Sequence, residues 1–159
     1  MMQRSSDQRV LGYLGRALSL EFSAVQQYST QARLVATWGL AEPAARLRDE
    51  ATEEMGHVER VISRMLALGV APNASTLRPV QLGQDLQALL RHDQALEHEL
   101  VRLYDDATRY CVGQGDPDNR LFFETLLEEE KAHGRELDRW LEEIERPGAS
   151  SPVQQRATF

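Results

Sequence analysis

The chain has 159 residues, of which 42% are hydrophobic and 27% charged, and its formal net charge at pH 7 is −7. These values predict a single globular domain over residues 1–159, and the absence of any Lys- or Arg-rich run argues against nucleic acid as the main partner. With one cysteine, Cys111, no signal-peptide core and no apolar run of about 20 residues, we expect a soluble cytoplasmic protein without a membrane span.

Apolar residues spaced three, four or seven apart predict four long helices. Ser5 or Ser6 is the expected cap of the first helix, and Pro43 is a favourable first-turn residue for the second. Gly39 and Gly69 are the expected stops of these two helices. The expected helices cover about 6–38, 43–68, 84–112 and 117–145, and the tail 146–159 is expected to contain a short fifth helix.

The lengths of the connections predict the topology. Helices one and two are joined by about four residues, and so are helices three and four, which makes each pair an antiparallel hairpin. The middle connection, GVAPNASTLRPVQLG over residues 69–83, can reach about 46 Å when extended. A helix of about 25 residues is roughly 38 Å long. The chain is therefore expected to form a four-helix bundle with one long crossover between helices two and three.

Each predicted helix carries polar residues within its apolar stripe. Helices one and three have a single glutamate there, Glu21 and Glu97. Helices two and four each have a Glu-x-x-His pair, and residues at i and i+3 project from one helix face. These pairs are Glu54 with His57, and Glu130 with His133.

The spacing of these residues repeats. Glu21 precedes Glu54 by 33 residues, as Glu97 precedes Glu130, and the two halves of the set are offset by 76 residues, an offset that Tyr28 and Tyr104 share. A single Glu-x-x-His pair arises easily by chance on a solvated helix of a Glu-rich chain. Two pairs, two further glutamates and a common spacing are much harder to obtain by chance, and they indicate a duplicated helical hairpin.

Charge indicates what such a site would hold. Four unpaired carboxylates inside a bundle would each cost several kcal/mol, and no Lys or Arg occupies the matching stripe positions. Two divalent cations would neutralise the four glutamates with both histidines uncharged. Oxygen-rich coordination with one imidazole per metal suits iron or manganese, and less distinctively zinc or cobalt.

The segments LSLEFSAVQQY, EEMGHVER, DQALEHEL and EEEKAHGREL resemble those of bacterioferritins, over about residues 8–145. The resemblance implies an all-α, ferritin-like bundle with a ferroxidase centre of two iron ions per subunit. It implies that Glu21 and His57 hold one iron and that Glu97 and His133 hold the other. Glu54 and Glu130 would then bridge the two irons.

Met55 follows Glu54 and is therefore rotated about 100° around the helix, away from this site. A lone methionine on a helix usually serves packing, but the resemblance implies that Met55 binds haem b, one haem per subunit dimer. It also implies that Tyr28 and Trp38 lie near the site as electron donors, although core packing explains both equally well. Two further positions match an extra iron site of the family, Asp49 and Glu53.

The resemblance implies oxidation of Fe²⁺ by O₂ or H₂O₂ and storage of ferric mineral in a cage of 24 subunits, either identical or mixed with a second bacterioferritin subunit. Haem would pass electrons from a small ferredoxin for iron release. Two alternatives remain: a di-iron or di-manganese oxidase or peroxide scavenger without storage, and a non-enzymatic cage or haem-binding subunit. His92 and His98 do not share the face of Glu97, and we interpret both as surface residues.

Overall fold

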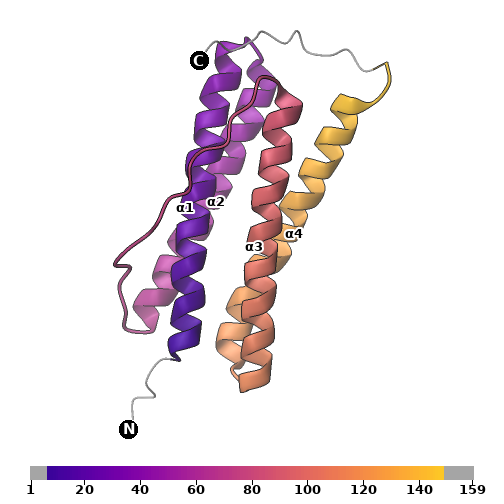
Figure 1. Cartoon of the computed structure of the whole chain (residues 1–159). Coiled ribbons are helices and arrows are strands. Elements are labelled where there is room, and N and C mark those ends of the chain that lie inside the picture. Colours follow the sequence, from indigo (N-terminus) through magenta and orange to yellow (C-terminus); the bar gives the residue numbers. More distant parts are fainter. Residues whose placement is uncertain (1–6, 149–159) are drawn as a thin grey trace.

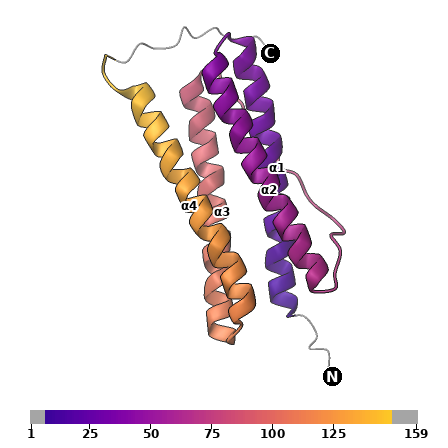
Figure 2. The same ribbon diagram turned by 180° about the vertical axis from the view of Figure 1, so that it is seen from behind.

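The computed structural model describes residues 7–148, and these form four helices without strands. The helices are α1 (Gln8–Thr37), α2 (Ala41–Ala67), α3 (Leu86–Gln114) and α4 (Pro117–Glu145). Helix α1 packs along α2, α3 packs along α4, and contacts between α1 and α3 join the two hairpins (Figure 1). Helices α2 and α4 lie on the opposite side of the bundle (Figure 2). The predicted all-α bundle is confirmed, whereas most of the expected fifth helix, residues 149–159, lies outside the described residues.

The helix ends differ from the sequence expectations in three places. Asp7, rather than Ser5 or Ser6, caps α1, because its carboxylate accepts hydrogen bonds from the backbone N–H groups of Arg9 and Val10. Helix α2 begins at Ala41, so that Pro43 lies within its first turn, where its missing N–H has no role. Helix α3 continues to Gln114. The stops at Gly39 and Gly69 are real, since both adopt a positive φ, of 78° and 80°.

The crossover, residues 70–85, runs the length of the bundle along α1 (Figure 1). Polar residues at every fourth position of α1 hold it there. Backbone N–H groups of the crossover donate to Ser19 and Ser23, at 3.0 Å each, and to Gln27 at 3.3 Å. Gln31 in turn donates to the carbonyl of Gln81 at 3.2 Å. Because i and i+4 positions share a helix face, this stripe satisfies crossover backbone groups that have no secondary structure of their own.

Large apolar side chains fill the interior between the four helices. These side chains come from both hairpins and are fully buried. They include Leu14, Leu18, Leu47, Leu89, Leu90, Leu100, Phe123, Leu126 and Leu137. Val25 of α1 is only partly buried and lines a surface groove beside Met55. No described helix is long and apolar enough to span a membrane.

One buried carboxylate lies outside the predicted site. Asp93 of α3 is fully buried, and its Oδ1 accepts a hydrogen bond from Gln27 Nε2 at 2.8 Å, while its Oδ2 has no partner. Burial raises the pKa of Asp93 to about 7, although the hydrogen bond from Gln27 and the nearby amide of Gln31 oppose the shift. The folded chain therefore favours the neutral form of Asp93.

We expect the Asp93→Asn variant to gain stability relative to the wild type as the pH rises from about 4 to about 7. Below about pH 4, Asp93 is neutral in both the folded and the unfolded chain. Above about pH 7 the folded wild type carries a buried charge, and one pKa unit corresponds to about 1.4 kcal/mol. Urea unfolding midpoints of both proteins across this range provide the test. A difference between them that does not vary with pH would contradict the prediction.

Candidate metal centre

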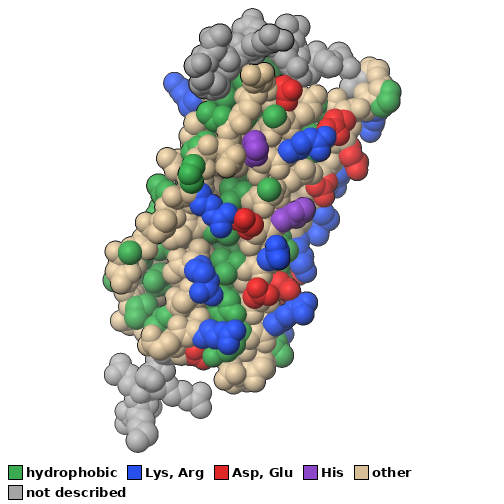
Figure 3. All heavy atoms as spheres, viewed as in Figure 1, with side chains coloured by type: hydrophobic (Ala, Val, Ile, Leu, Met, Phe, Trp, Pro, Cys, Tyr) green, Lys and Arg blue, Asp and Glu red, His purple; other side chains and the backbone are tan. Residues whose placement is uncertain are grey.

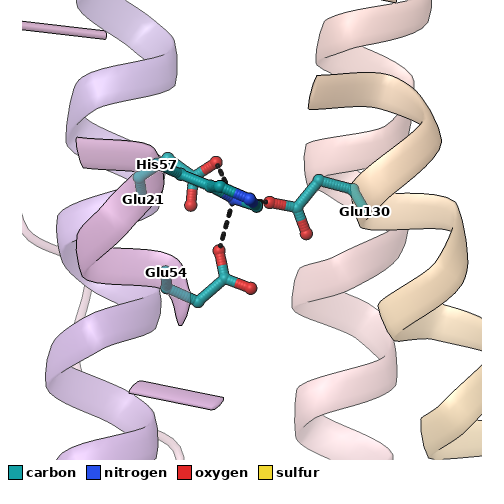
Figure 4. A group of neighbouring side chains, drawn as sticks. All are labelled: Glu21, Glu54, His57 and Glu130. Carbon is teal, nitrogen blue, oxygen red and sulfur yellow. Dashed lines mark hydrogen bonds and ion pairs between the residues drawn. The ribbon is translucent and has the colours of Figure 1, made fainter. Parts of the chain in front are cut away.

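The six predicted ligands converge inside the bundle, where all four helices contribute. Figure 4 shows Glu21 of α1 with Glu54 and His57 of α2, facing Glu130 of α4 across the interior. Their ligand atoms form two groups, within each of which all atoms lie within 4.8 Å of one another. One group contains Glu21, Glu54, His57 and Glu130, and the other contains Glu54, Glu97, Glu130 and His133. Glu54 and Glu130 belong to both groups, as two bridging ligands would.

Each histidine reaches the shared glutamate of the opposite hairpin. His57 Nδ1 lies 2.6 Å from Glu130 Oε1, and His133 Nδ1 lies 2.8 Å from Glu54 Oε1. The two imidazole rings stack with centroids 5.6 Å apart and an interplanar angle of 15°. This reciprocal arrangement follows from the duplicated hairpin, because equivalent residues of the two halves face each other across a pseudo-twofold axis.

Two tyrosines extend the same symmetry. Tyr28 O–H donates to Glu97 Oε1, and Tyr104 O–H donates to Glu21 Oε1, both at 2.7 Å. Burial raises the pKa of both phenols well above their ordinary value, and the nearby carboxylates raise it further. Each phenol therefore stays neutral and orients one glutamate of the other hairpin. The expected position of Tyr28 near the site agrees with this geometry, and Tyr104 holds the equivalent position in the other hairpin, as the 76-residue offset of the two tyrosines indicates.

Burial and mutual repulsion decide the charge of the carboxylates when no cation is bound. Burial, together with the charge of Glu54, raises the pKa of Glu21 and of Glu97 to about 8. Burial also raises the pKa of Glu130. The pKa of Glu54 is instead lowered despite its burial, because Glu21 and both histidines hydrogen-bond to it. Protons therefore compensate the negative charge of this interior in the absence of metal.

The histidines hold part of this compensating charge. Burial opposes protonation of His57, but hydrogen bonds to Glu130, Glu21 and Glu54 raise its pKa to about 12. For His133, burial is likewise outweighed by the hydrogen bond and charge of Glu54, which raise its pKa to about 10. A divalent cation requires the opposite state, with neutral imidazole and charged carboxylate.

The donor set fits two divalent cations. The second carboxylate oxygen, Oε2, of each of Glu21, Glu54, Glu97 and Glu130 is buried without a hydrogen-bond partner. Within residues 7–148, these four side chains interact with histidine, with tyrosine and with one another, and no lysine or arginine neutralises them. Buried carboxylate oxygens without partners are costly unless a cation coordinates them.

A third group of possible metal ligands adjoins the centre, and its residues differ from those predicted for the extra iron site. Glu53 was expected there and does form an ion pair with His133 Nε2. The other predicted residue, Asp49, is exposed and belongs to no candidate metal group of the described chain. Glu50 takes that place with Glu53 and His133. The sequence offered a signal for Glu50, because it precedes Glu54 by four residues and therefore shares its helix face.

The remaining predicted residues lie away from the metal ligands. Met55 is 37% exposed on α2, in a groove of about 570 Å³ that α1 and α2 form. Trp38 is buried just after α1, ten residues beyond Tyr28 and so about 15 Å further along the helix. His98 is exposed and His92 is half-buried, and neither belongs to a candidate metal group of the described residues.

We expect metal binding to displace protons. Addition of redox-inert Zn²⁺ to the metal-free protein at pH 7 should release more than one proton per ion, because both imidazoles are charged at that pH. The affinity for Zn²⁺ should rise as the pH increases from 6 to 9, through the pKa of about 8 of Glu21 and Glu97. A pH indicator in weak buffer measures the release. Binding without proton release and without pH dependence would rule out this charge assignment.

Comparison with known proteins agrees with this geometry. The ferritin-like domain family matches residues 11–146. The bacterioferritin of Rhodobacter capsulatus is 39% identical over 127 residues, which cover 80% of this chain and 79% of that protein. The bacterioferritin of Brucella melitensis is 33% identical over 79% of this chain and 78% of its own length.

Solved structures show the same likeness. A structure of Rhodobacter capsulatus bacterioferritin, which has a metal-free dinuclear site and a haem iron, matches with a TM-score of 0.82 and 36% identity over 86% of each chain. The bacterioferritin BfrA of Mycobacterium tuberculosis matches with a TM-score of 0.85 and 28% identity over 91% of each chain. The chain therefore belongs to the ferritin-like family and, within it, to the bacterioferritins.

Proposed function

We propose that the protein is an iron-storage ferroxidase that oxidises Fe²⁺ to Fe³⁺ at the buried centre. The observation that carries this proposal is the pair of overlapping four-residue groups that share Glu54 and Glu130. Together they offer each of two metal ions one histidine, one glutamate of its own and two shared carboxylates. This charge-balanced set, in a protein of the bacterioferritin family, favours iron as the metal and O₂ or H₂O₂ as the oxidant.

In this proposal Glu21 and His57 hold one iron, and Glu97 and His133 hold the other. Two adjacent iron ions supply two electrons to one oxidant molecule. The protein positions the ligands: Tyr28 and Tyr104 each fix the orientation of a carboxylate through a 2.7 Å hydrogen bond. Each of the six ligand residues is at most 7% exposed to solvent, and this burial limits the access of bulk water to the centre. The ligands must first lose the protons that compensate their charge in the metal-free state.

The acidic group beside the centre suits the transfer of iron between the centre and the mineral. Glu53 pairs with His133 Nε2, whereas the shared Glu54 contacts Nδ1 of the same ring, and a carboxylate oxygen of Glu50 lies within 4.8 Å of the other two ligand atoms of this group. Carboxylates bind both Fe²⁺ and Fe³⁺, so these two residues can hold an ion on its way to or from the site. Ferric product would collect inside a cage of 24 subunits. We assign electron donation to Tyr28, which contacts the centre, and leave Trp38 as a more distant candidate.

The groove around Met55 fits one half of a haem site. The Met55 side chain is exposed, and a side chain added at the adjacent Gly56 would contact no other group within 4 Å, so this surface is open to a planar ligand. Arg33 and Arg48 line the same groove and carry positive charge suited to the haem carboxylates. Met55 of each of two subunits would hold one haem b between them, and the haem would supply electron transfer for iron release.

A small ferredoxin would supply those electrons, and the cage would contain this chain alone or together with a second bacterioferritin subunit, in the cytoplasm. The donor set by itself does not distinguish iron from manganese. A di-iron or di-manganese oxidase or peroxide scavenger therefore remains the alternative function. Gel filtration separates the two, because storage requires a large assembly whereas the alternative would be compatible with a stable dimer.

We expect Glu54→Ala and His133→Ala to slow aerobic Fe²⁺ oxidation by about tenfold or more, since even residues that only support a metal ligand typically contribute that much. Stopped-flow absorbance after Fe²⁺ addition measures the rate. Glu142→Ala, which removes an exposed glutamate of α4, is the matched control and should oxidise Fe²⁺ at the wild-type rate. Wild-type rates in both site variants would refute the assignment.

We expect Met55→Leu to lose the haem absorbance band while retaining Fe²⁺ oxidation, because Leu preserves the apolar volume but has no sulfur to coordinate iron. Glu54→Ala, one residue away, should show the reverse pattern. Visible spectra of the purified proteins, together with the oxidation assay, test both halves of this dissociation. Wild-type haem content in Met55→Leu would show that another residue binds the haem.

A further inference from the structure

A second site lies on the face of the bundle formed by α1, α3 and the crossover, apart from both the metal centre and the Met55 groove. We call it the outer groove. It has a volume of about 630 Å³, which is within the range of small-molecule sites. A cavity of about 350 Å³ adjoins it, and Ser23, Arg78 and Glu99 line both. Figure 3 shows basic side chains on this face beside a strip of hydrophobic ones.

The outer groove is part of the fixed architecture. Gly12 and Gly15 of α1 line it, and a Cβ added at Gly15 would meet nothing within 4 Å, so the helix backbone leaves open space there. The crossover forms another wall, and hydrogen bonds of 3.0 Å to Ser19 and Ser23 hold it against α1. The groove is therefore open between α1 and the crossover, and the position of the crossover wall is fixed by these hydrogen bonds.

Hydrogen-bond donors dominate the polar lining. Arg16 stacks on the ring of Tyr13, with its guanidinium 4.9 Å from the ring centroid, and Arg102 is exposed. Neither arginine has a carboxylate partner among residues 7–148. The hydroxyl of Ser19 already accepts a bond from the crossover, and its hydrogen is available to donate.

One acidic side chain lines the outer groove, and it is already paired. Glu99 forms an ion pair with Arg78 across the groove. With Arg16 and Arg102 the lining therefore carries two uncompensated positive charges, in a chain whose net charge is −7. A negatively charged ligand whose polar atoms accept hydrogen bonds is complementary to these donors and positive charges.

We propose that the outer groove binds a phosphate-bearing small molecule, with the phosphate between Arg16 and Arg102. Guanidinium groups bind phosphate oxygens in pairs, and the hydroxyl of Ser19 adds a further donor. Leu20, Leu103 and Ala74 line the same groove and offer an apolar surface. The ligand is therefore a phosphate monoester with an aromatic or apolar body. This proposal does not depend on the ferroxidase assignment.

Isothermal titration of full-length protein, stripped of metal by a chelator and held at low ionic strength, tests the proposal. The probes are phenyl phosphate and inorganic phosphate. Arg16→Ala combined with Arg102→Ala should weaken binding of phenyl phosphate by about tenfold or more. The control combines Arg135→Ala with Arg139→Ala, two exposed arginines of α4 outside the groove, and should bind as the wild type does. Equal loss in both double variants would overturn the proposal.

The Gly15→Leu variant distinguishes an organic phosphate monoester from free inorganic phosphate as the ligand. Leucine at this position fills the groove and is favourable in a helix, so the variant should fold. It should weaken phenyl phosphate by about tenfold and leave inorganic phosphate unchanged if the ligand is an organic monoester. Binding of both probes with equal affinity, unaffected by Gly15→Leu, would instead assign the site to free phosphate. No binding of either probe at millimolar concentration would refute the proposal.

Discussion

The structure depends on how four carboxylates are neutralised inside an apolar bundle. Glu21, Glu54, Glu97 and Glu130 are all fully buried, and none is paired with lysine or arginine in the described chain. Without cations, the interior is compensated by protons on the histidines and on some of the carboxyl groups. Two divalent cations would compensate it better, because they could also coordinate the four carboxylate oxygens that lack a hydrogen-bond partner. Charge balance in the core is therefore the physical reason why this fold offers a site for metal ions.

Duplication of the helical hairpin explains why the centre is complete within one chain. Each hairpin supplies one glutamate and one Glu-x-x-His pair, and each also supplies a tyrosine to the other half. The crossover makes this possible, because it carries the chain back along α1 and places the second hairpin in the orientation that the pseudo-twofold axis requires. The i, i+4 polar stripe of α1 fixes the crossover, and two of its residues, Ser19 and Ser23, also line the outer groove.

Three consecutive residues of α2 lie on different faces of the helix and therefore contribute to different sites. Glu54 faces the interior, and Met55 faces the groove between α1 and α2. Glu53 forms an ion pair with Nε2 of His133. The pitch of an α-helix, about 100° per residue, separates these directions without any irregular backbone. The proposed oxidation, iron transfer and haem sites therefore lie within a few residues of one another while remaining chemically distinct.

The sequence by itself determined the four helices, because helical periodicity depends only on local geometry. The length of the middle connection determined the long crossover between helices two and three. The 33- and 76-residue spacings identified the six clustered residues. The sequence also excluded Met55 from the centre. It did not locate Asp93 or Glu50, since a carboxylate on a helix is recognised as buried, or as part of a site, only when the opposing helices are in place. The outer groove likewise combines α1, α3 and the crossover. Such features were decided by the tertiary structure, because burial, partner geometry and pKa shifts arise from residues far apart in the chain.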